Sequence, residues 1–579
     1  CGTLCPAPFR CGYFEGCGMR LGRLILFLAP ILLIACSADQ GRAQAGHNQT
    51  ASPPGTAPMT IGVSTLFGQG WSARYWPLLE SLPVPVVREG ISWRLVESVP
   101  GQFVFDAKNS GHIDRICQMK RTVVLVLLPR HPAYDANATV YTPAGRAAFA
   151  AYVDALASHF GPCLAAVEIG NEINGAGNMI GPAATDRARY HVDLLNDVYA
   201  RVKPRHPDLV LLGGSTNAIG TGFLDSLFAI GGLAQMDGVA VHPYRPDATN
   251  VDWELGRLFA AMQRAGGMKQ VWATEFGSDE SDASLTPAYF AQMVTLMSAA
   301  GVSHADWFAL VDEPRFPHFG LYAADGSPKP VAAAFSYFAR DILPRSRAEA
   351  LSGGAGGLFH YRFGPDMQIV WGTSRSFQTS GNLVFRDLAG NIMAQPEGVS
   401  LTPFLAEGPG QIIFAPPTLL ADSLYDYGRA PWSYFGHRGM DADRSLAPTD
   451  WLFTSFIGDP ALKPATINQQ GLLPSGLGKR AVTLTIRYSP EISGTLYASA
   501  CLVNRVAGST GGQFQLLHDG ALLYGGAVGD TPITVTHPMT VGQGDQIDFR
   551  FTPPNDKTKA GMIQYRLRIS RSAADTATC

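Results

Sequence analysis

The stretches Val167–Glu172 (VEIGNE) and Val271–Gly277 (VWATEFG) decide the fold of this chain. Each is a short apolar run that leads to a glutamate, Glu172 in the first and Glu275 in the second. A β-strand that carries an acid just past its last buried residue presents that acid at the edge of a sheet, where a cleft can form. Two such acids in one domain indicate chemistry that uses a pair of carboxylates.

Short apolar runs alternate with helical stretches along the first part of the chain. The runs of strand length are 61–65, 84–88, 122–128, 165–169, 209–212, 238–241, 271–274 and 305–310. The helical stretches include 144–159, 185–202, 251–265 and 287–300. Eight strands that alternate with helices predict a (β/α)8 barrel over residues 60–340. A doubly wound open sheet is the alternative, but it needs a ligand-binding glycine-rich turn after the first strand, and Gly62–Ser64 is not one.

The order of the strands places the two glutamates in one site. Active sites of (β/α)8 barrels lie at the C-terminal ends of the strands. Glu172 follows the fourth run and Glu275 ends the seventh, so the two strand ends face each other across the barrel mouth. Glycoside hydrolysis is the commonest reaction of paired carboxylates, and its retaining form needs the two groups about 5–5.5 Å apart. We therefore expect hydrolysis of an O-glycosyl bond.

The sequence pattern changes after residue 340, where the helical signal stops. Residues 341–416 show short strands separated by Gly, Asp and Pro turns, which predicts a small β-sandwich. Residues 417–579 predict a jelly-roll-like all-β domain. This last domain is either a carbohydrate-binding module or a structural brace for the barrel, because a sandwich fold does not determine function. The expected fold class is α/β, followed by these two all-β domains.

The N-terminal residues have the pattern of an export signal. Met19 and two arginines precede the apolar run 24–35, and small residues follow it. We expect residues 1–45 to be an upstream extension and a signal peptide, with cleavage after Ala45, and residues 46–59 to be a linker. The alternative is a lipobox that lipidates Cys36 and anchors the protein to a membrane. Either outcome predicts export to the periplasm, the outer membrane or the exterior of a bacterium.

Charge and cysteine content narrow the class of protein further. The 44 basic and 47 acidic residues give a net charge of −3 without a basic stripe, so no nucleic-acid partner is expected, and we expect a monomer.

Beyond Cys36, the cysteines are Cys117, Cys163, Cys501 and Cys579, an even number in an exported chain. Cys117 and Cys163 each precede a predicted strand. They can pair if those strands are neighbours, and a 501–579 bridge follows by elimination; four free thiols are the alternative.

The barrel region resembles clan A glycoside hydrolases, and family 39 in particular. In that clan an Asn-Glu pair ends strand four and a Glu ends strand seven, which matches Asn171-Glu172 and Glu275. The resemblance implies that Glu172 is the general acid/base and Glu275 the nucleophile. It also implies that Asn171 hydrogen-bonds the 2-hydroxyl of the sugar. The resemblance covers about residues 60–340 and, more loosely, residues 341–415.

Other motifs extend the resemblance to the walls of the site. The stretch Val86–Asp106 resembles the clan's second-strand region, where Arg88 lies near the nucleophile and keeps it ionised. VAVHPYRP, which begins at Val239, resembles strand six, where His242 and Tyr244 line the site. Trp307 resembles the aromatic platform under the sugar that strand eight carries.

Some candidates rest on weaker signals. Trp93 and Tyr134 are candidates for sugar contacts, because aromatic faces suit the C–H surfaces of sugars. Glu168 is the main rival acid, and we expect it to be a buried structural group, paired with an arginine. No cofactor is expected, and no spacing of His, Asp and Glu resembles a zinc site.

The chain departs from its family at the first motif. Many members have Trp-Asn-Glu-Pro, whereas Gly170 and Ile173 flank the Asn-Glu pair here. The departure weakens any transfer of substrate from xylosidases and iduronidases, and the pattern is closer to bacterial endoglycosidases encoded with exopolysaccharide genes. We therefore expect a secreted retaining β-glycosidase that cleaves a polysaccharide or exopolysaccharide internally. An exo-β-xylosidase or β-glucosidase is one alternative, and a non-catalytic glycan-binding envelope protein is another.

Overall fold

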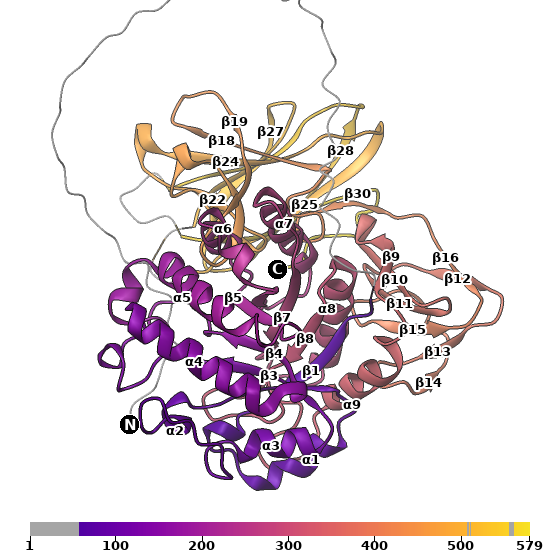
Figure 1. Ribbon diagram of the computed structural model, residues 1–579. Coiled ribbons are helices and arrows are strands. Elements are labelled where there is room, and N and C mark those ends of the chain that lie inside the picture. Colours follow the sequence, from indigo (N-terminus) through magenta and orange to yellow (C-terminus); the bar gives the residue numbers. More distant parts are fainter. Residues whose placement is uncertain (1–56, 507–508, 510, 555–560) are drawn as a thin grey trace, which may run out of the picture. The chain divides into compact units, whose positions relative to one another are not determined.

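The computed structural model describes residues 57–506, 509, 511–554 and 561–579. Its first part contains eight parallel strands that close into a barrel in the order of the sequence (Figure 1). They are β1 (Thr60–Ser64), β2 (Val86–Gly90), β3 (Thr122–Leu127), β4 (Leu164–Ile169), β5 (Leu211–Asn217), β6 (Gly238–His242), β7 (Gln270–Phe276) and β8 (His304–Trp307). The predicted (β/α)8 barrel is confirmed, and the open sheet is wrong.

Helices connect the strands of the barrel and lie outside them (Figure 1). They are α1 (Trp76–Ser81), α2 (Trp93–Val96), α3 (Gly111–Gln118), α4 (Pro143–Phe160), α5 (Arg187–Val202), α6 (Thr221–Ala229), α7 (Val251–Arg264), α8 (Thr286–Ala300) and α9 (Pro330–Tyr337). Local sequence sets their ends. The start of α4, for example, has Pro143 in its first turn, and Thr142 accepts a hydrogen bond from the backbone of Gly145.

The interior of the barrel is layered. An apolar layer consists of Val86, Val124, Ala166, Leu212, Ala240 and Trp272. Side chains two positions apart along a strand point to the same face. The residue two positions nearer the C-terminal end is polar and buried in four of these strands: Arg88 in β2, Glu168 in β4, His242 in β6 and Thr274 in β7. The sequence alternation thus places a charged layer between the apolar layer and the barrel mouth.

The chain beyond α9 forms a small all-β region. It contains a six-stranded sheet in the order β14-β13-β15-β11-β10-β9 and a two-stranded sheet, β12-β16. The strands are β9 (Ala348–Gly353), β10 (Leu358–Phe363), β11 (Met367–Gly372), β12 (Phe377–Ser380), β13 (Val384–Arg386), β14 (Ile392–Met393), β15 (Phe404–Glu407) and β16 (Gln411–Phe414). Phe359, Tyr361 and Ile369 belong to the same apolar core as the barrel, whereas Phe377 and Phe404 belong to a separate core.

The C-terminal region is a second, larger all-β unit with two antiparallel sheets. One has the order β20-β21-β22-β23-β30-β25-β28, with β17 also paired to β30, and the other has the order β19-β18-β24-β29-β26-β27. The strands are β17 (Leu419–Asp422), β18 (Trp432–Arg438), β19 (Arg444–Ser445), β20 (Ala447–Asp450), β21 (Ser455–Gly458), β22 (Thr466–Ile467), β23 (Gly471–Leu473), β24 (Val482–Tyr488), β25 (Gly494–Asn504), β26 (Gly512–His518), β27 (Ala521–Val528), β28 (Ile533–Val541), β29 (Ile547–Thr552) and β30 (Ile563–Ser570). The predicted succession of a barrel and all-β domains is confirmed.

The C-terminal unit contacts the barrel at the start of α7. Arg429 donates a hydrogen bond of 2.7 Å to Asp252. The rings of Trp253 and Tyr427 meet edge to face, with their centroids 5.1 Å apart. A Cβ atom at residue 428 would lie 2.7 Å from the Trp253 ring, so the close approach requires Gly428.

Two disulfides, Cys117–Cys163 and Cys501–Cys579, confirm both predicted pairings.

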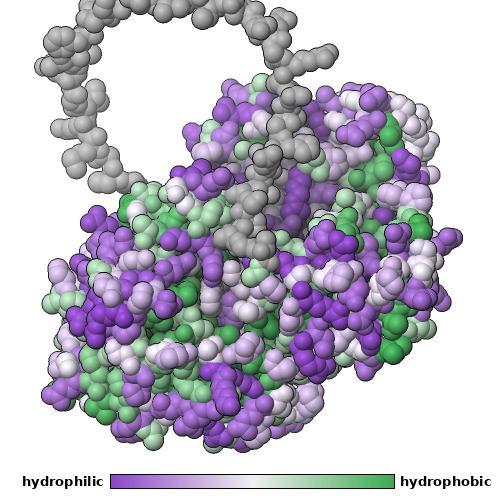
Figure 2. Space-filling model, turned by 45° about the vertical axis from the view of Figure 1, so that its right-hand side comes forward, coloured by the Kyte–Doolittle hydropathy of each residue, from purple (hydrophilic) through white to green (hydrophobic). Residues whose placement is uncertain are grey.

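The predicted signal peptide, the cleavage after Ala45 and the lipidation of Cys36 lie outside the described residues. Among the residues that are described, none of the helices has the length and hydropathy of a membrane span. Figure 2 shows hydrophilic and hydrophobic residues mixed over the face in view, in keeping with the charged fraction of 16%.

Removal of the barrel disulfide is expected to destabilise the barrel alone. The Cys117→Ser/Cys163→Ser variant frees a loop with a sequence separation of 46 residues. The added entropy of the unfolded chain lowers the free energy of unfolding by roughly 2–4 kcal/mol. Differential scanning calorimetry should show an earlier barrel transition. In the matched variant Cys501→Ser/Cys579→Ser, the transition that shifts should be that of the C-terminal unit, and a shift of both transitions by either variant would contradict the prediction.

Candidate active site

Glu172 lies three residues beyond β4, on a loop with an unusual backbone. Gly170 has φ +90°, and Glu172 itself has φ +48°, in the left-handed region that residues with a side chain rarely adopt. Asn217, at the end of β5, donates a hydrogen bond of 2.8 Å to Glu172 Oε1. Asn178 donates another, of 3.0 Å, to the Glu172 carbonyl. These contacts hold Glu172 in a conformation whose strain is typical of a functional site.

Glu275 lies in β7 and points into the barrel mouth because the strand is irregular. The register between β7 and β8 shifts between Ala273 and Phe276. Such an irregularity re-aims side chains, so that Thr274 and Glu275, although adjacent, both reach interior partners. Arg88 Nη1 donates to Glu275 Oε1 at 2.5 Å. The Tyr244 hydroxyl donates to Glu275 Oε2 at 2.8 Å.

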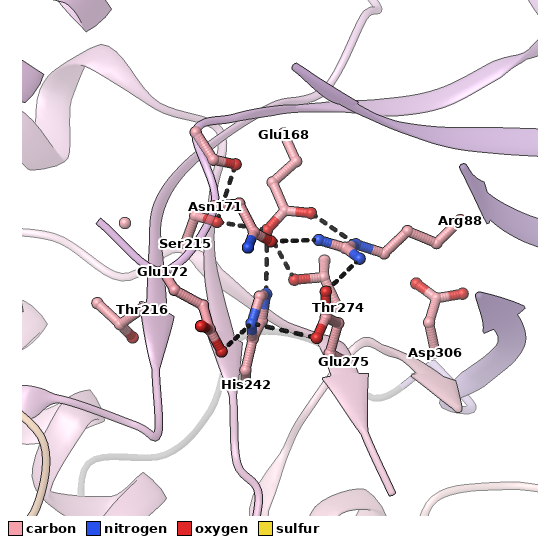
Figure 3. A network of polar contacts seen from close by, with 12 residues as sticks. Arg88, Glu168, Asn171, Glu172, Ser215, Thr216, His242, Thr274, Glu275 and Asp306 are labelled. Carbon is pink, nitrogen blue, oxygen red and sulfur yellow. Dashed lines mark hydrogen bonds and ion pairs between the residues drawn. The ribbon is translucent and has the colours of Figure 1, made fainter. Parts of the chain in front are cut away.

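The structure brings the two predicted acids together around His242 (Figure 3). One carboxylate oxygen of Glu172 and one of Glu275 lie within 4.8 Å of each other. His242 Nδ1 lies 3.4 Å from Glu172 Oε1 and 3.6 Å from Glu275 Oε2. The imidazole is fully buried. Arg88, Asn171, His242 and Tyr244, all proposed from the sequence, therefore converge on one site.

The rival acid Glu168 is a structural group, as predicted. It is fully buried and pairs with Arg88 Nε at 2.8 Å. Hydroxyl groups of Ser215 and Thr274 donate to its Oε1 at 2.7 and 3.0 Å. Arg88 also donates to Asn171 Oδ1 at 3.0 Å. The guanidinium thus joins the buried acid, the predicted nucleophile and the predicted sugar-binding amide (Figure 3).

Opposite charges in the site stabilise one another's ionised forms, and this shifts several pKa values. Burial opposes the charge on His242, but the surrounding carboxylates, Glu275 foremost, outweigh it and raise the pKa of His242 to about 9. Burial alone would raise the pKa of Glu172, yet the contacts with His242 and Asn217 prevail and the pKa lies below its usual value. Arg88 likewise lowers the pKa of Glu168, against the effect of burial. Before substrate binds, Glu172 is therefore ionised at neutral pH.

No protein-family model matches the sequence, and no curated protein matches it. The structure is similar to a family 39 glycoside hydrolase from the gut symbiont Bacteroides cellulosilyticus WH2, with a TM-score of 0.50 and 19% identity. The match covers 61% of this chain and 81% of that one. Over the matched part, this chain shares its fold with that family 39 glycoside hydrolase.

Further similarities extend over other shares of the chain. A family 39 β-xylosidase from Caulobacter crescentus has a TM-score of 0.45 and 16% identity, over 58% of this chain and 84% of that one. A family 39 enzyme from Xanthomonas axonopodis pv. citri has a TM-score of 0.42 and 14% identity, over 87% of this chain and 96% of that one.

The sequence-based choice of sugar platform is wrong. Trp307 is 0% exposed, its rings pack against Phe276 and Phe290, and its Nε1 donates to the Phe319 carbonyl at 2.9 Å. The next residue, Phe308, borders the mouth instead, in an apolar cluster with Tyr244. The prediction failed because a tryptophan in a strand is equally suited to the core, and adjacent residues of a strand point to opposite faces.

Trp93 is also a core residue, contrary to the prediction. It is 3% exposed and stacks between Tyr134 and Tyr152, with ring centroids 5.3 and 5.5 Å away. Its Nε1 and the Tyr134 hydroxyl both donate to Glu97. Tyr134 keeps part of its surface exposed, so its role in sugar binding stays a prediction.

Sequence reasoning missed the residues that support the acids. Asn217, Ser215 and Thr274 contact Glu172 or Glu168 directly. For Ser215 and Asn217, the signal was the polar ending Gly213–Asn217 of an otherwise apolar strand. Glu172, His242 and Glu275 are also close enough to share a metal ion, as are three residues of the C-terminal unit, His518, Asp519 and Asp545. In the barrel site, however, Arg88 and protonated His242 already supply positive charge, which disfavours a further cation.

Neutralising Glu168 is expected to destabilise the fold. In the Glu168→Gln variant, Arg88 keeps its burial but loses its fully buried counter-ion, which costs about 3–5 kcal/mol for a buried pair. Chemical denaturation measures the loss. The matched control is Glu80→Gln, which removes an exposed partner of Arg115 and should change stability by less than about 1 kcal/mol. Equal effects of the two variants would show that the buried network is not structurally important.

Proposed function

We propose that this protein is an exported retaining β-glycoside hydrolase. The observation that carries the proposal is the separation of Glu172 and Glu275, whose closest carboxylate oxygens lie within 4.8 Å. Retaining glycosidases hold their carboxyl groups about 5–5.5 Å apart, whereas inverting enzymes need about 6.5–9.5 Å to admit a water molecule. The family 39 fold, with these acids at strands β4 and β7, agrees with the same reaction.

The reaction takes two displacements. Glu275 attacks the anomeric carbon, the bond to the leaving oxygen breaks, and Glu172 transfers its proton to that oxygen. A water molecule then attacks the same carbon, Glu172 accepts its proton, and the ester bond to Glu275 breaks. Each displacement inverts the anomeric centre, so the overall reaction retains its configuration.

Neighbouring groups prepare each acid for its role. Arg88 and Tyr244 each bind one oxygen of Glu275, which fixes the plane of the carboxylate and orients it as a nucleophile. Asn171 accepts from Arg88 through Oδ1, so its NH2 group is left to donate to a sugar hydroxyl. Asn217 and His242 both contact Oε1 of Glu172. The transferable proton therefore belongs on Oε2.

A polysaccharide cleaved internally is the proposed substrate. Glu172 has 23% and Glu275 12% of its side chain exposed, so both carboxylates are accessible to a substrate. Phe316 is 40% exposed and packs on Phe308, whose ring meets that of Tyr244, so it provides apolar surface near the site. Export is supported by the two disulfides and by the signal-like N-terminal sequence. Product sizing on a polysaccharide panel distinguishes internal cleavage from the release of single sugars.

Covalent trapping tests the nucleophile. An activated 2-fluoro sugar should form a stable ester on Glu275, because the fluorine slows the second step more than an activated first step. Mass spectrometry of peptides locates the label. Glu275→Ala should abolish labelling and lower kcat by at least about a thousand-fold in a protein that still folds, as circular dichroism should show. A label on another residue, or full activity of the variant, would refute the assignment.

The pH dependence tests the acid/base. Glu172 must be protonated to act as an acid, and its lowered pKa confines that form to acidic pH. The alkaline limb of kcat/KM should therefore lie on the acid side of neutrality. In His242→Gln the cation is lost, the pKa of Glu172 rises, and that limb should move to higher pH. Asp247→Asn, a charge change in the loop that follows β6, serves as the control. A limb that stays or moves to lower pH in His242→Gln would contradict the assignment.

A further inference from the structure

A hairpin of the C-terminal unit reaches the barrel next to the predicted acid/base. Its strands are β20 and β21, and Trp451–Thr454 is the connecting loop. The backbone N–H of Gly220 donates to the Phe453 carbonyl at 3.0 Å, and that of Gly222 donates to the Trp451 carbonyl at 3.0 Å. Gly220 and Gly222 lie at the start of α6, directly after β5. The loop therefore lies at the C-terminal end of the barrel strands, where the active site is.

A chain of hydrogen bonds connects this loop to Glu172. The Asn174 side chain, which is buried, donates from Nδ2 to the Leu452 carbonyl at 2.7 Å and to the Asn217 carbonyl at 2.9 Å. Its Oδ1 accepts from the backbone N–H of Asn217 at 2.8 Å. The Asn217 side chain in turn donates to Glu172 Oε1 at 2.8 Å. One carbonyl of the C-terminal unit thus completes the support of the acid/base.

The hairpin is fixed firmly enough to act as a support. Arg257 in α7 forms a bidentate pair with Asp450, at 2.5 and 2.8 Å, and Ser455 donates to the same carboxylate at 2.7 Å. Such fork-like pairs restrain orientation as well as distance. At Gly222 a Cβ atom would lie 2.7 Å from the backbone N and O of Trp451, so a side chain there must displace the hairpin.

The same loop exposes apolar surface beside the site. Trp451 is 52% and Leu452 39% exposed, although they lie where the loop contacts the barrel. Glu172, the proposed general acid, protonates the oxygen of the leaving sugar. Because Asn174 and Asn217 connect the loop to Glu172, we expect the loop to border that sugar. An exposed indole is well suited to the apolar face of a sugar ring.

We propose that the Trp451–Thr454 loop of the C-terminal unit forms the leaving-group side of the active site. Its Leu452 carbonyl positions Glu172 through Asn174 and Asn217, and the Trp451 side chain contacts the leaving sugar. Asn174 is a positioning residue, and Trp451 determines specificity. This inference rests on the proposed glycosidase function. It gives the C-terminal unit a part in the reaction that differs from both a remote carbohydrate-binding module and a passive brace.

A comparison of two substrates isolates this role. A β-glycosyl fluoride carries no leaving sugar and needs little acid assistance, whereas a β-linked oligosaccharide needs both a leaving-sugar site and a proton from Glu172. A panel of xylosyl, glucosyl, mannosyl and galactosyl fluorides identifies the sugar that the full-length enzyme accepts. The measured quantity is kcat/KM for the β-linked tetrasaccharide of that sugar divided by kcat/KM for its fluoride.

Three variants alter the loop in different ways. Asn174→Ala breaks the hydrogen-bond chain, and Gly222→Ala displaces the hairpin by its added Cβ atom. Both should lower the ratio about ten- to a hundred-fold, mainly through kcat for the tetrasaccharide. Trp451→Ala should lower it about ten-fold, mainly through KM. The matched control, Met440→Ala, removes a fully exposed side chain elsewhere in the same unit and should leave the ratio unchanged.

The outcomes separate the inference from the proposed function. Equal losses on both substrates would mean that the hairpin is only a brace, and an unchanged ratio in folded Gly222→Ala and Trp451→Ala would likewise overturn the inference. Trp451 is exposed, so its variant is informative even if Asn174→Ala fails to fold. Turnover of the fluoride by wild type, with covalent labelling of Glu275, would sustain the proposed function in either case. Absence of all turnover by wild type would overturn the proposed function, and the inference with it.

Discussion

The site depends on one buried cation, the guanidinium of Arg88. It binds Glu168 beneath it, Glu275 at the mouth and Asn171 beside it, and each contact uses a different nitrogen. A buried charge of this kind is tolerated only when its partners are well placed, because desolvation costs several kcal/mol. Glu168 is therefore as necessary as the acids above it, although it takes no part in the proposed reaction. The planar geometry of the group also fixes the relative positions of β2, β4 and β7.

The two glutamates lie in different environments, and the difference matches their proposed roles. Glu275 is held by a cation and a phenol, which fix the orientation of both carboxylate oxygens. Glu172 lies on a loop with a left-handed backbone, with one oxygen hydrogen-bonded and the other left for proton transfer. His242 contacts both acids, so a change in the charge of one alters the other. Formation of the ester on Glu275 removes a negative charge from this cluster.

The C-terminal unit adds a constraint that a barrel alone would lack. Its contacts with α7 at Asp252 and Arg257 restrain the unit, and its hairpin loop meets the loop after β5 through backbone groups. Backbone contacts leave little trace in a sequence, because many side chains are compatible with them. In the sequence, only Gly220 and Gly222 indicate that the hairpin loop comes close to the barrel. Glycine occurs in proteins for many other reasons, so the contact could not be predicted from them.

The sequence by itself determined the barrel, the positions of Glu172 and Glu275 at strands four and seven, and the grouping of Arg88, Asn171, His242 and Tyr244. These follow from the period of two in strands and from the rule that barrel sites lie at strand C-termini. Only the tertiary structure decided that Trp307 and Trp93 are core residues and that Phe308 borders the mouth, since burial depends on which face of a strand meets which neighbour. It also decided that Asn174, Asn217 and the Leu452 carbonyl support the acid/base. That arrangement joins segments far apart in the chain, and hydrogen bonds between such segments have no local sequence pattern.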